Sequence, residues 1–163
     1  MTRHEALRLK ILSDETLGRQ LSVWKLQSKK IVFTNGCFDL IHPGHIDYLV
    51  KAADMGDVLI IGVNSDRSVR ELKGTTRPIN NEFSRCTVLA ALGFVSAVIV
   101  FDEATPYNLI KKIQPDVLVK GGDWKPENIV GNDIVYAKGG VVASIDFLPG
   151  FSTSLIEKKI KEG

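Results

Sequence analysis

Apolar residues recur along the chain in two patterns, short runs typical of buried strands and spacings typical of helices. Their alternation predicts strands separated by helices. Short apolar runs that suit buried strands lie at 31–34, 57–64, 95–101, 117–120 and 141–147. Helical patterns or helix-start signals lie at 13–27, 43–55, 65–72, 81–92, 105–113 and 133–138, and a last helix is expected from residue 152. Strands that alternate with helices predict an α/β fold, doubly wound, with a mainly parallel five-stranded sheet and helices on both faces.

The composition limits what this fold can be used for. A chain of 163 residues suits one domain, here residues 1–163, in which residues 1–28 form an N-terminal helical extension. The net charge of +2 is too small to indicate a nucleic-acid-binding surface. Cys37 and Cys86 show no disulfide framework, and neither a signal peptide nor a membrane-spanning run is found. The sequence therefore predicts a cytoplasmic protein without membrane or nucleic-acid partners.

The polar stretch between the first predicted strand and its helix is the strongest functional signal. It comprises Thr34, Asn35, Gly36, Cys37, Phe38 and Asp39, followed by Leu40-Ile41 and by His42-Pro43-Gly44-His45. A turn from strand to helix is the place where α/β proteins hold anions, because the helix N-terminus carries partial positive charge. Gly36 can adopt positive φ and lets a ligand approach the backbone closely. We expect Pro43 to occupy the first helical position and Gly44 to keep the helix mouth open. His42 and His45 lie three residues apart and should share one face.

Three other interpretations of this stretch remain open. In the first, His42 and His45 are ordinary surface residues. In the second, Cys37 is only a small residue in a tight turn. In the third, Cys37, Asp39, His42 and His45 bind zinc, since all four are ligand types. However, none of the common Cys/His zinc spacings is present, and a Pro-Gly pair between the histidines suits phosphates better. We predict no protein-bound metal.

The same residues carry a family resemblance. His42-Pro43-Gly44-His45 resembles the HxGH signature of the nucleotidyltransferases, and Gly36-Cys37-Phe38-Asp39 resembles the G-x-F-D turn of their cytidylyltransferase-type branch. This family binds a nucleoside triphosphate on a Rossmann-like sheet, so the resemblance implies that fold and that ligand. It implies that His42 and His45 contact the triphosphate and that His45 stabilises charge on the bridging or leaving phosphate oxygens.

Three further groups are candidates for the same site. They are the basic residues Lys73, Arg77 and Arg85; the strand-end segment Lys120-Gly121-Gly122-Asp123-Trp124, with Gly122, Asp123 and Trp124 as the predicted contacts; and the hydroxyl residues Ser152, Thr153 and Ser154. The first group resembles the family's basic loop, with Lys73 reaching both substrates' phosphates; the alternative is a solvated basic loop. The second suits a base or ribose; the alternative is a tight turn with a packed tryptophan. The third resembles the family's S-T-T segment and would bind the β- and γ-phosphates, although Ser152 also suits a plain N-cap.

Taken in order, these motifs resemble one subfamily over nearly all of the chain from Lys29 onward. It is the adenylyltransferase subfamily that converts ATP and D-glycero-β-D-manno-heptose 1-phosphate, a sugar 1-phosphate, into ADP-heptose for lipopolysaccharide. The resemblance implies Mg²⁺ brought by ATP, a homo-oligomer and, because this chain has no room for the fused kinase of many relatives, a separate sugar kinase. A cytidylyltransferase acting on glycerol 3-phosphate or phosphoethanolamine is the nearest alternative. A non-catalytic nucleotide-binding module is the alternative of another class.

Overall fold

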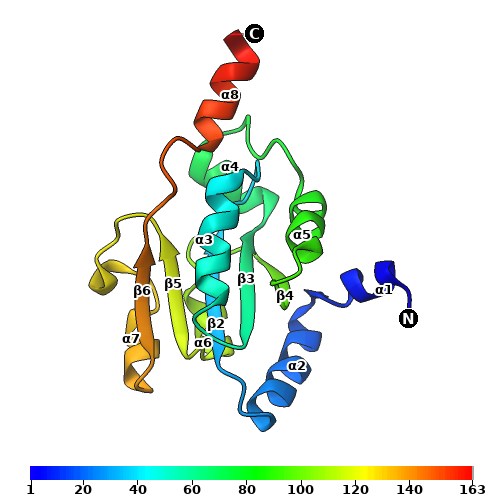
Figure 1. Ribbon diagram of the computed structural model, residues 1–163, viewed down its shortest axis with the longest axis vertical. Helices are drawn as coiled ribbons and strands as arrows, with labels where there is room; N and C mark the ends of the chain where they lie inside the picture. The colour runs from blue at the N-terminus through cyan, green and yellow to red at the C-terminus, as the bar shows by residue number, and fades with distance from the viewer. Residues whose placement is uncertain (163) are drawn as a thin grey trace.

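The computed structural model describes residues 1–162, and its helices and strands alternate as the sequence predicts (Figure 1). The helices are α1 (Arg3–Arg8), α2 (Asp14–Leu26), α3 (Pro43–Ala53), α4 (Asp66–Lys73), α5 (Glu82–Ala91), α6 (Tyr107–Ile113), α7 (Asn132–Ala137) and α8 (Thr153–Glu162). The strands are β1 (Ile11–Leu12), β2 (Ile31–Gly36), β3 (Val58–Asn64), β4 (Ala97–Phe101), β5 (Val117–Gly121) and β6 (Val141–Ile145), and a short 3₁₀ turn covers Pro126–Asn128.

All strands of the described chain run parallel in one sheet of order β1-β4-β3-β2-β5-β6. The predicted doubly wound parallel sheet is confirmed, but it has six strands rather than five. The additional strand is β1, whose two residues pair with β4 through Ile11 opposite Val98. Two residues carry no periodicity of their own, so only the contact with β4 makes this segment a strand.

Each face of the sheet has its own core. On one face, Phe33 and Leu118 of the sheet pack with Leu17 of α2, Ile110 of α6 and Val135 of α7. On the other face, side chains from α3 and α5 pack on the sheet, among them Tyr48, Leu49, Cys86 and Leu89. Within the predicted N-terminal helical extension, residues 1–28, Leu17 and Leu21 of α2 are buried against the first of these faces.

The helix starts agree with the capping signals of the sequence. The side chains of Ser13, Ser65 and Asn81 each accept a hydrogen bond from the backbone N–H three residues further on. These contacts satisfy N–H groups that have no partner inside the helix, which is why Ser and Asn mark helix starts. The predicted boundaries at these three positions are confirmed.

The sheet order determines where a ligand binds. From β2 the chain proceeds through β3 to β4 on one side and returns through β5 to β6 on the other, so β2 lies at the point where the strand order reverses. Parallel sheets bind ligands at the carboxyl ends of the strands beside that point. Helix α8 extends beyond this end of the sheet (Figure 1), and none of its described residues is buried. None of the helices within residues 1–162 is long and apolar enough to cross a membrane.

Candidate active site

A cleft of about 560 Å³ opens at the carboxyl ends of the strands, around the turn that follows β2. This volume lies within the range of small-molecule sites. The residues that line it come from β2 and its turn, α3, the end of α4, the ends of β3, β4 and β5, the loops that follow β4, β5 and β6, and the N-terminus of α8. They are Asn35, Gly36, Cys37, Phe38, Asp39, His45, Tyr48, Asn64, Leu72, Lys73, Phe101, Ala104, Thr105, Pro106, Lys120, Gly121, Trp124, Val130, Phe147 and Thr153.

The two histidines lie together at the start of α3. Pro43 occupies the first helical position, as predicted, and His42 is the N-cap. The imidazole rings of His42 and His45 stack, with centroids 3.9 Å apart and an interplanar angle of 28°. A Cβ atom at Gly44 would lie 3.0 Å from His42 Nδ1 and 3.3 Å from Phe151 Cβ, so a side chain at this position would crowd the histidine. The expected shared face of the histidines is therefore confirmed.

Both imidazoles are neutral near pH 7. Burial, the neighbouring His42 and Lys73 lower the pKa of His45 to about 4, and burial lowers the pKa of His42. Nδ1 of each ring is buried, and no hydrogen-bond partner for either is found within residues 1–162. A buried polar atom without a partner is costly unless a ligand or water satisfies it. Two such atoms at a helix mouth beside the cleft indicate a site that is completed by a polar ligand.

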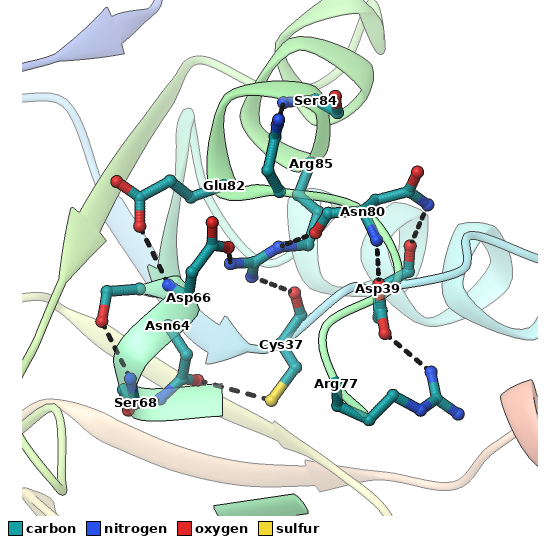
Figure 2. Close-up of polar contacts among 12 residues, drawn as sticks. Cys37, Asp39, Asn64, Asp66, Ser68, Arg77, Asn80, Glu82, Ser84 and Arg85 are labelled. Atoms are coloured by element: carbon teal, nitrogen blue, oxygen red, sulfur yellow. Dashed lines mark hydrogen bonds and ion pairs between the residues drawn. The ribbon is translucent and has the colours of Figure 1, made fainter. Parts of the chain in front are cut away.

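The turn residue Asp39 is a structural anchor. Its carboxylate accepts hydrogen bonds from the Ile79 N–H (2.9 Å), the Asn80 N–H (2.8 Å) and Arg77 Nη1 (2.6 Å), as Figure 2 shows in part. Burial opposes ionisation, but these donors lower the pKa of Asp39 below its usual value. Arg77 also forms an ion pair with Glu157 of α8. Arg77 therefore joins the β2 turn to α8 and does not line the cleft, which corrects its predicted role in binding phosphate.

Arg85 is likewise turned away from the cleft. Its side chain is fully buried, and its guanidinium donates to the Cys37 carbonyl oxygen (2.6 Å), the Asn80 carbonyl oxygen (3.0 Å) and the Asp66 carboxylate (2.8 Å; Figure 2). All its donor nitrogens are engaged with protein oxygens. The predicted contact between Arg85 and a phosphate is wrong in this structure, because the guanidinium holds the β2 turn from behind.

The first residues of the turn divide between the cleft and the core. The Thr34 hydroxyl is buried and hydrogen-bonded to the Tyr48 hydroxyl, so Thr34 positions a lining residue. Gly36 is the last residue of β2, and the turn has its positive φ at Phe38 (49°) rather than at the glycine. Cys37 Sγ lies 3.9 Å from Asn64 Oδ1. Burial raises the pKa of the Cys37 thiol, and a protonated thiol is a poor metal ligand.

Some of the other predicted residues line the cleft and some do not. Lys73, Trp124 and Thr153 line the cleft. Gly122, Asp123, Ser152 and Ser154 are outside its lining. The Ser152 hydroxyl accepts a hydrogen bond from the Leu155 N–H, as in the plain N-cap interpretation. Of the predicted segment Ser152-Thr153-Ser154, only Thr153 lines the cleft.

Several lining residues were not among the predicted contacts of the site. Among them are Tyr48, Asn64, Lys120 and Phe147. The sequence analysis placed Lys120 at the start of a candidate segment, and Asn64 and Lys120 lie at the carboxyl ends of β3 and β5, where polar residues indicate a ligand site. Tyr48 and Phe147 gave no such signal, because aromatic residues in helices and near strands are usually core residues.

A parallel α/β sheet with an HxGH helix start at its switch point is the architecture of a nucleotide-binding domain. The cytidylyltransferase-like family model matches residues 33–157, which is most of the chain. This chain therefore belongs to the cytidylyltransferase-like family and is a nucleotidyltransferase.

Individual relatives agree with this assignment. The chain is 52% identical over 151 residues to a protein named Bifunctional protein HldE from Rhodopseudomonas palustris (strain HaA2), covering 93% of this chain and 31% of that protein. It is 56% identical over 153 residues to the protein of the same name from Campylobacter jejuni subsp. doylei, covering 94% of this chain and 32% of that protein. The chain thus spans about a third of the length of these curated relatives.

Two solved structures are similar in fold. The lipopolysaccharide core biosynthesis protein from Thermoplasma volcanium GSS1 superimposes with a TM-score of 0.60 at 28% identity, over 74% of this chain and 97% of that one. Pantoate-beta-alanine ligase from Francisella tularensis superimposes with a TM-score of 0.62 at 17% identity, over 93% of this chain and 76% of that one. The second likeness supports the fold alone.

Proposed function

We propose that this chain transfers AMP from ATP to a sugar 1-phosphate, D-glycero-β-D-manno-heptose 1-phosphate, and releases ADP-heptose and pyrophosphate. The single observation that carries this proposal is the alignment of nearly the whole chain with part of HldE proteins at more than 50% identity. The stacked His42–His45 pair beside a cleft of small-molecule size supports the same reaction. The relative from Thermoplasma volcanium carries a name from lipopolysaccharide core synthesis, which agrees with a sugar-phosphate acceptor.

The chemistry is an in-line displacement at the α-phosphorus of ATP. An oxygen of the acceptor phosphate forms the new bond, the bond between the α-phosphorus and the bridging oxygen breaks, and pyrophosphate leaves with that electron pair. A phosphate monoester is largely ionised at neutral pH, so the attack requires no general base. The protein supplies alignment of the two substrates and stabilisation of the phosphate oxygens.

His45 and Lys73 are the residues proposed to stabilise the transition state. His45 lines the cleft from the first turn of α3 and is neutral at pH 7, so it would act as a hydrogen-bond donor rather than as a cation. Lys73 is the last residue of α4, is exposed and lines the same cleft, so its ammonium group would meet the phosphates from the opposite side. The N-terminus of α8 with Thr153 is the proposed contact of the β- and γ-phosphates.

Magnesium would reach this site as part of the MgATP substrate. Mg²⁺ prefers oxygen ligands and often binds through substrate phosphates and water. In residues 1–162, no group of three or more His, Cys, Asp or Glu side chains is arranged to hold a metal, and the Asp39 carboxylate is occupied by protein donors. Bound to the phosphates, Mg²⁺ would neutralise charge on the leaving pyrophosphate.

We also propose a pathway partner, an oligomeric state and a compartment for this protein. A separate sugar kinase would supply the acceptor, the protein would form a homo-oligomer, and the cytosol would be its compartment. Size-exclusion chromatography with light scattering tests the second of these directly.

Pyrophosphate release tests the reaction. Purified protein is assayed with ATP or CTP against heptose 1-phosphate, other sugar 1-phosphates, glycerol 3-phosphate and phosphoethanolamine, with His45→Ala as the control for contaminating activity. We expect stoichiometric pyrophosphate and ADP-heptose only with ATP and the heptose phosphate. Turnover of CTP with glycerol 3-phosphate or phosphoethanolamine would assign the chain to the alternative reaction. Binding of nucleotide without turnover of any pair would indicate a non-catalytic module.

A further inference from the structure

Lys120 is a cation in the cleft that the proposed reaction has not yet used. It is the fourth residue of β5, which lies beside β2 at the switch point of the sheet. Successive side chains of a strand point to opposite faces. Val119 packs in the core on the α3 side and Leu118 in the core on the α6 side. Lys120 therefore points to the same side as Leu118, at the edge where the core ends and the cleft begins.

The Lys120 ammonium has no acidic partner in the protein. Over residues 1–162, no carboxylate lies within ion-pair distance of it, whereas Lys112 and Lys138 pair with Asp14 and Asp116. Lys120 is only partly exposed, and burial lowers the pKa of its ammonium group. The Trp124 ring lies close to the ammonium group, with its centroid 6.0 Å from Nζ. A partly desolvated cation without a counter-charge is costly, so an anion bound in the cleft would stabilise it.

Lys73 is a second ammonium group that lines the same cleft as Lys120. Lys73 and Lys120 both act on the Cys37 thiol, lowering its pKa against the larger effect of burial. Lys73 is the last residue of α4, which follows β3, and Lys120 lies in β5. Cys37 follows β2, the strand between β3 and β5. Two ammonium groups therefore approach one part of the cleft from the two neighbours of β2.

The position of these lysines differs from that of the triphosphate contacts. His45 and Tyr48 extend from α3, which covers the opposite face of the sheet from α6. Thr153 is close to this side as well, because Phe151 lies against Gly44. A triphosphate held by α3 and the start of α8 leaves Lys120 on the α6 side, where the second substrate has to bind for an in-line attack.

We propose that Lys120, together with Lys73, binds the phosphate group of the acceptor, so that Lys120 is a further substrate-binding residue of this site. The inference rests on the proposed nucleotidyl transfer and names the residues that hold its second substrate. The ammonium groups contact the oxygens of the acceptor phosphate that do not attack. No proton is transferred in the step described above.

Steady-state kinetics on Lys120→Met test this role. Methionine keeps much of the length of the side chain and removes its charge, and Lys111→Met on the exposed surface of α6 is the matched control. Losing one hydrogen bond to a charged group should raise the KM for the sugar 1-phosphate by roughly 10-fold to 100-fold. The KM for ATP should stay within about twofold, and Lys120→Arg should restore part of the loss. A rise in the KM for ATP alone, or no change in either constant, would overturn the inference.

Calorimetry separates this inference from the proposed function. Inorganic phosphate is titrated into protein saturated with a non-hydrolysable ATP analogue and Mg²⁺, which occupies the triphosphate contacts. Binding to the unmodified protein and to Lys111→Met, with at least tenfold weaker binding to Lys120→Met, would support the acceptor-phosphate site even if no acceptor of the panel is turned over. Equal binding of phosphate to all three proteins would overturn the role of Lys120 whatever the outcome of the pyrophosphate assay.

Discussion

The guanidinium of Arg85, which is not part of the cleft lining, donates a 2.6 Å hydrogen bond to the carbonyl oxygen of Cys37, and this contact fixes the turn that carries the site. The same guanidinium donates to the Asn80 carbonyl oxygen and to Asp66 (Figure 2). The β2 turn, the loop before α5 and the start of α4 are therefore held by one buried side chain. Asp39 and Arg77 connect the next part of the turn to the same loop and to α8.

Arg85→Met should destabilise the protein. It leaves the Asp66 carboxylate and two carbonyl oxygens without their donor, and breaking a buried pair of this kind costs about 3 kcal/mol or more. Chemical denaturation should show this loss of unfolding free energy. Arg70→Met, which removes an exposed arginine from α4, is the matched control and should change stability by less than about 0.5 kcal/mol. Equal stability of the two variants would contradict the anchoring role.

His45→Ala should remove most turnover and leave the fold intact. The imidazole lies at the cleft with an unpartnered buried Nδ1, so its loss removes a ligand contact rather than a core contact. One donor to a developing negative charge is worth roughly 10²–10³ in kcat. His4→Ala, at an exposed position, controls for the loss of a histidine. An unchanged kcat for His45→Ala would exclude the proposed role.

The pH dependence of stability should carry a contribution from His45. Burial lowers its pKa in the folded protein to about 4, below the usual value of 6.5, so the unfolded chain binds more protons between these two values. Unfolding free energy then falls as the pH decreases from 6.5 toward 4. Thermal unfolding of the free protein at pH 7 and pH 5 should show a smaller loss in His45→Gln than in the unmodified protein. An identical loss in both proteins would contradict a neutral His45.

Lys73→Ala should lower kcat more than it raises the KM for ATP. Lys73 ends α4 beside Gly74 and is exposed in the free protein, so it contributes most when charge shifts in the transition state. A decrease in kcat of about tenfold or more is expected from a single charge-assisted contact. Lys73→Arg should recover little, because a planar guanidinium does not replace a compact ammonium. A change confined to KM would mean that Lys73 only attracts ATP.

The purified protein should contain no stoichiometric zinc, and its activity should require added Mg²⁺. Asp39 is occupied by protein donors, and burial keeps the Cys37 thiol protonated, so two of the four residues in the zinc alternative are poor ligands here. Metal analysis of protein purified without chelators, followed by assays with EDTA and with Mg²⁺ restored, checks both statements. One tightly bound zinc per chain would support the metal-site alternative instead.

Local sequence information was sufficient for most of the fold and for the centre of the site. The start of α3 at Pro43, the N-caps at Ser13, Ser65 and Asn81, and the buried run of β3 were predicted because each depends on neighbouring residues in the chain. Periodicity and capping are local properties, and the sequence contains them completely. The placement of His42 and His45 on one face follows from helix geometry for the same reason.

Only the tertiary structure decided where the long charged side chains point. Arg77 and Arg85 follow a sequence pattern that suits phosphate binding, yet their guanidinium groups meet Asp39, Glu157, Asp66 and buried carbonyl oxygens. Lys120 has a position at a strand end as its only local signal, and it lies in this cleft because β5 returns beside β2. A flexible charged side chain binds the nearest complementary group. For Arg77 these groups are Asp39 and Glu157, which lie 38 and 80 residues away along the chain. Such distances are set by packing of the sheet and its helices, which no local pattern contains.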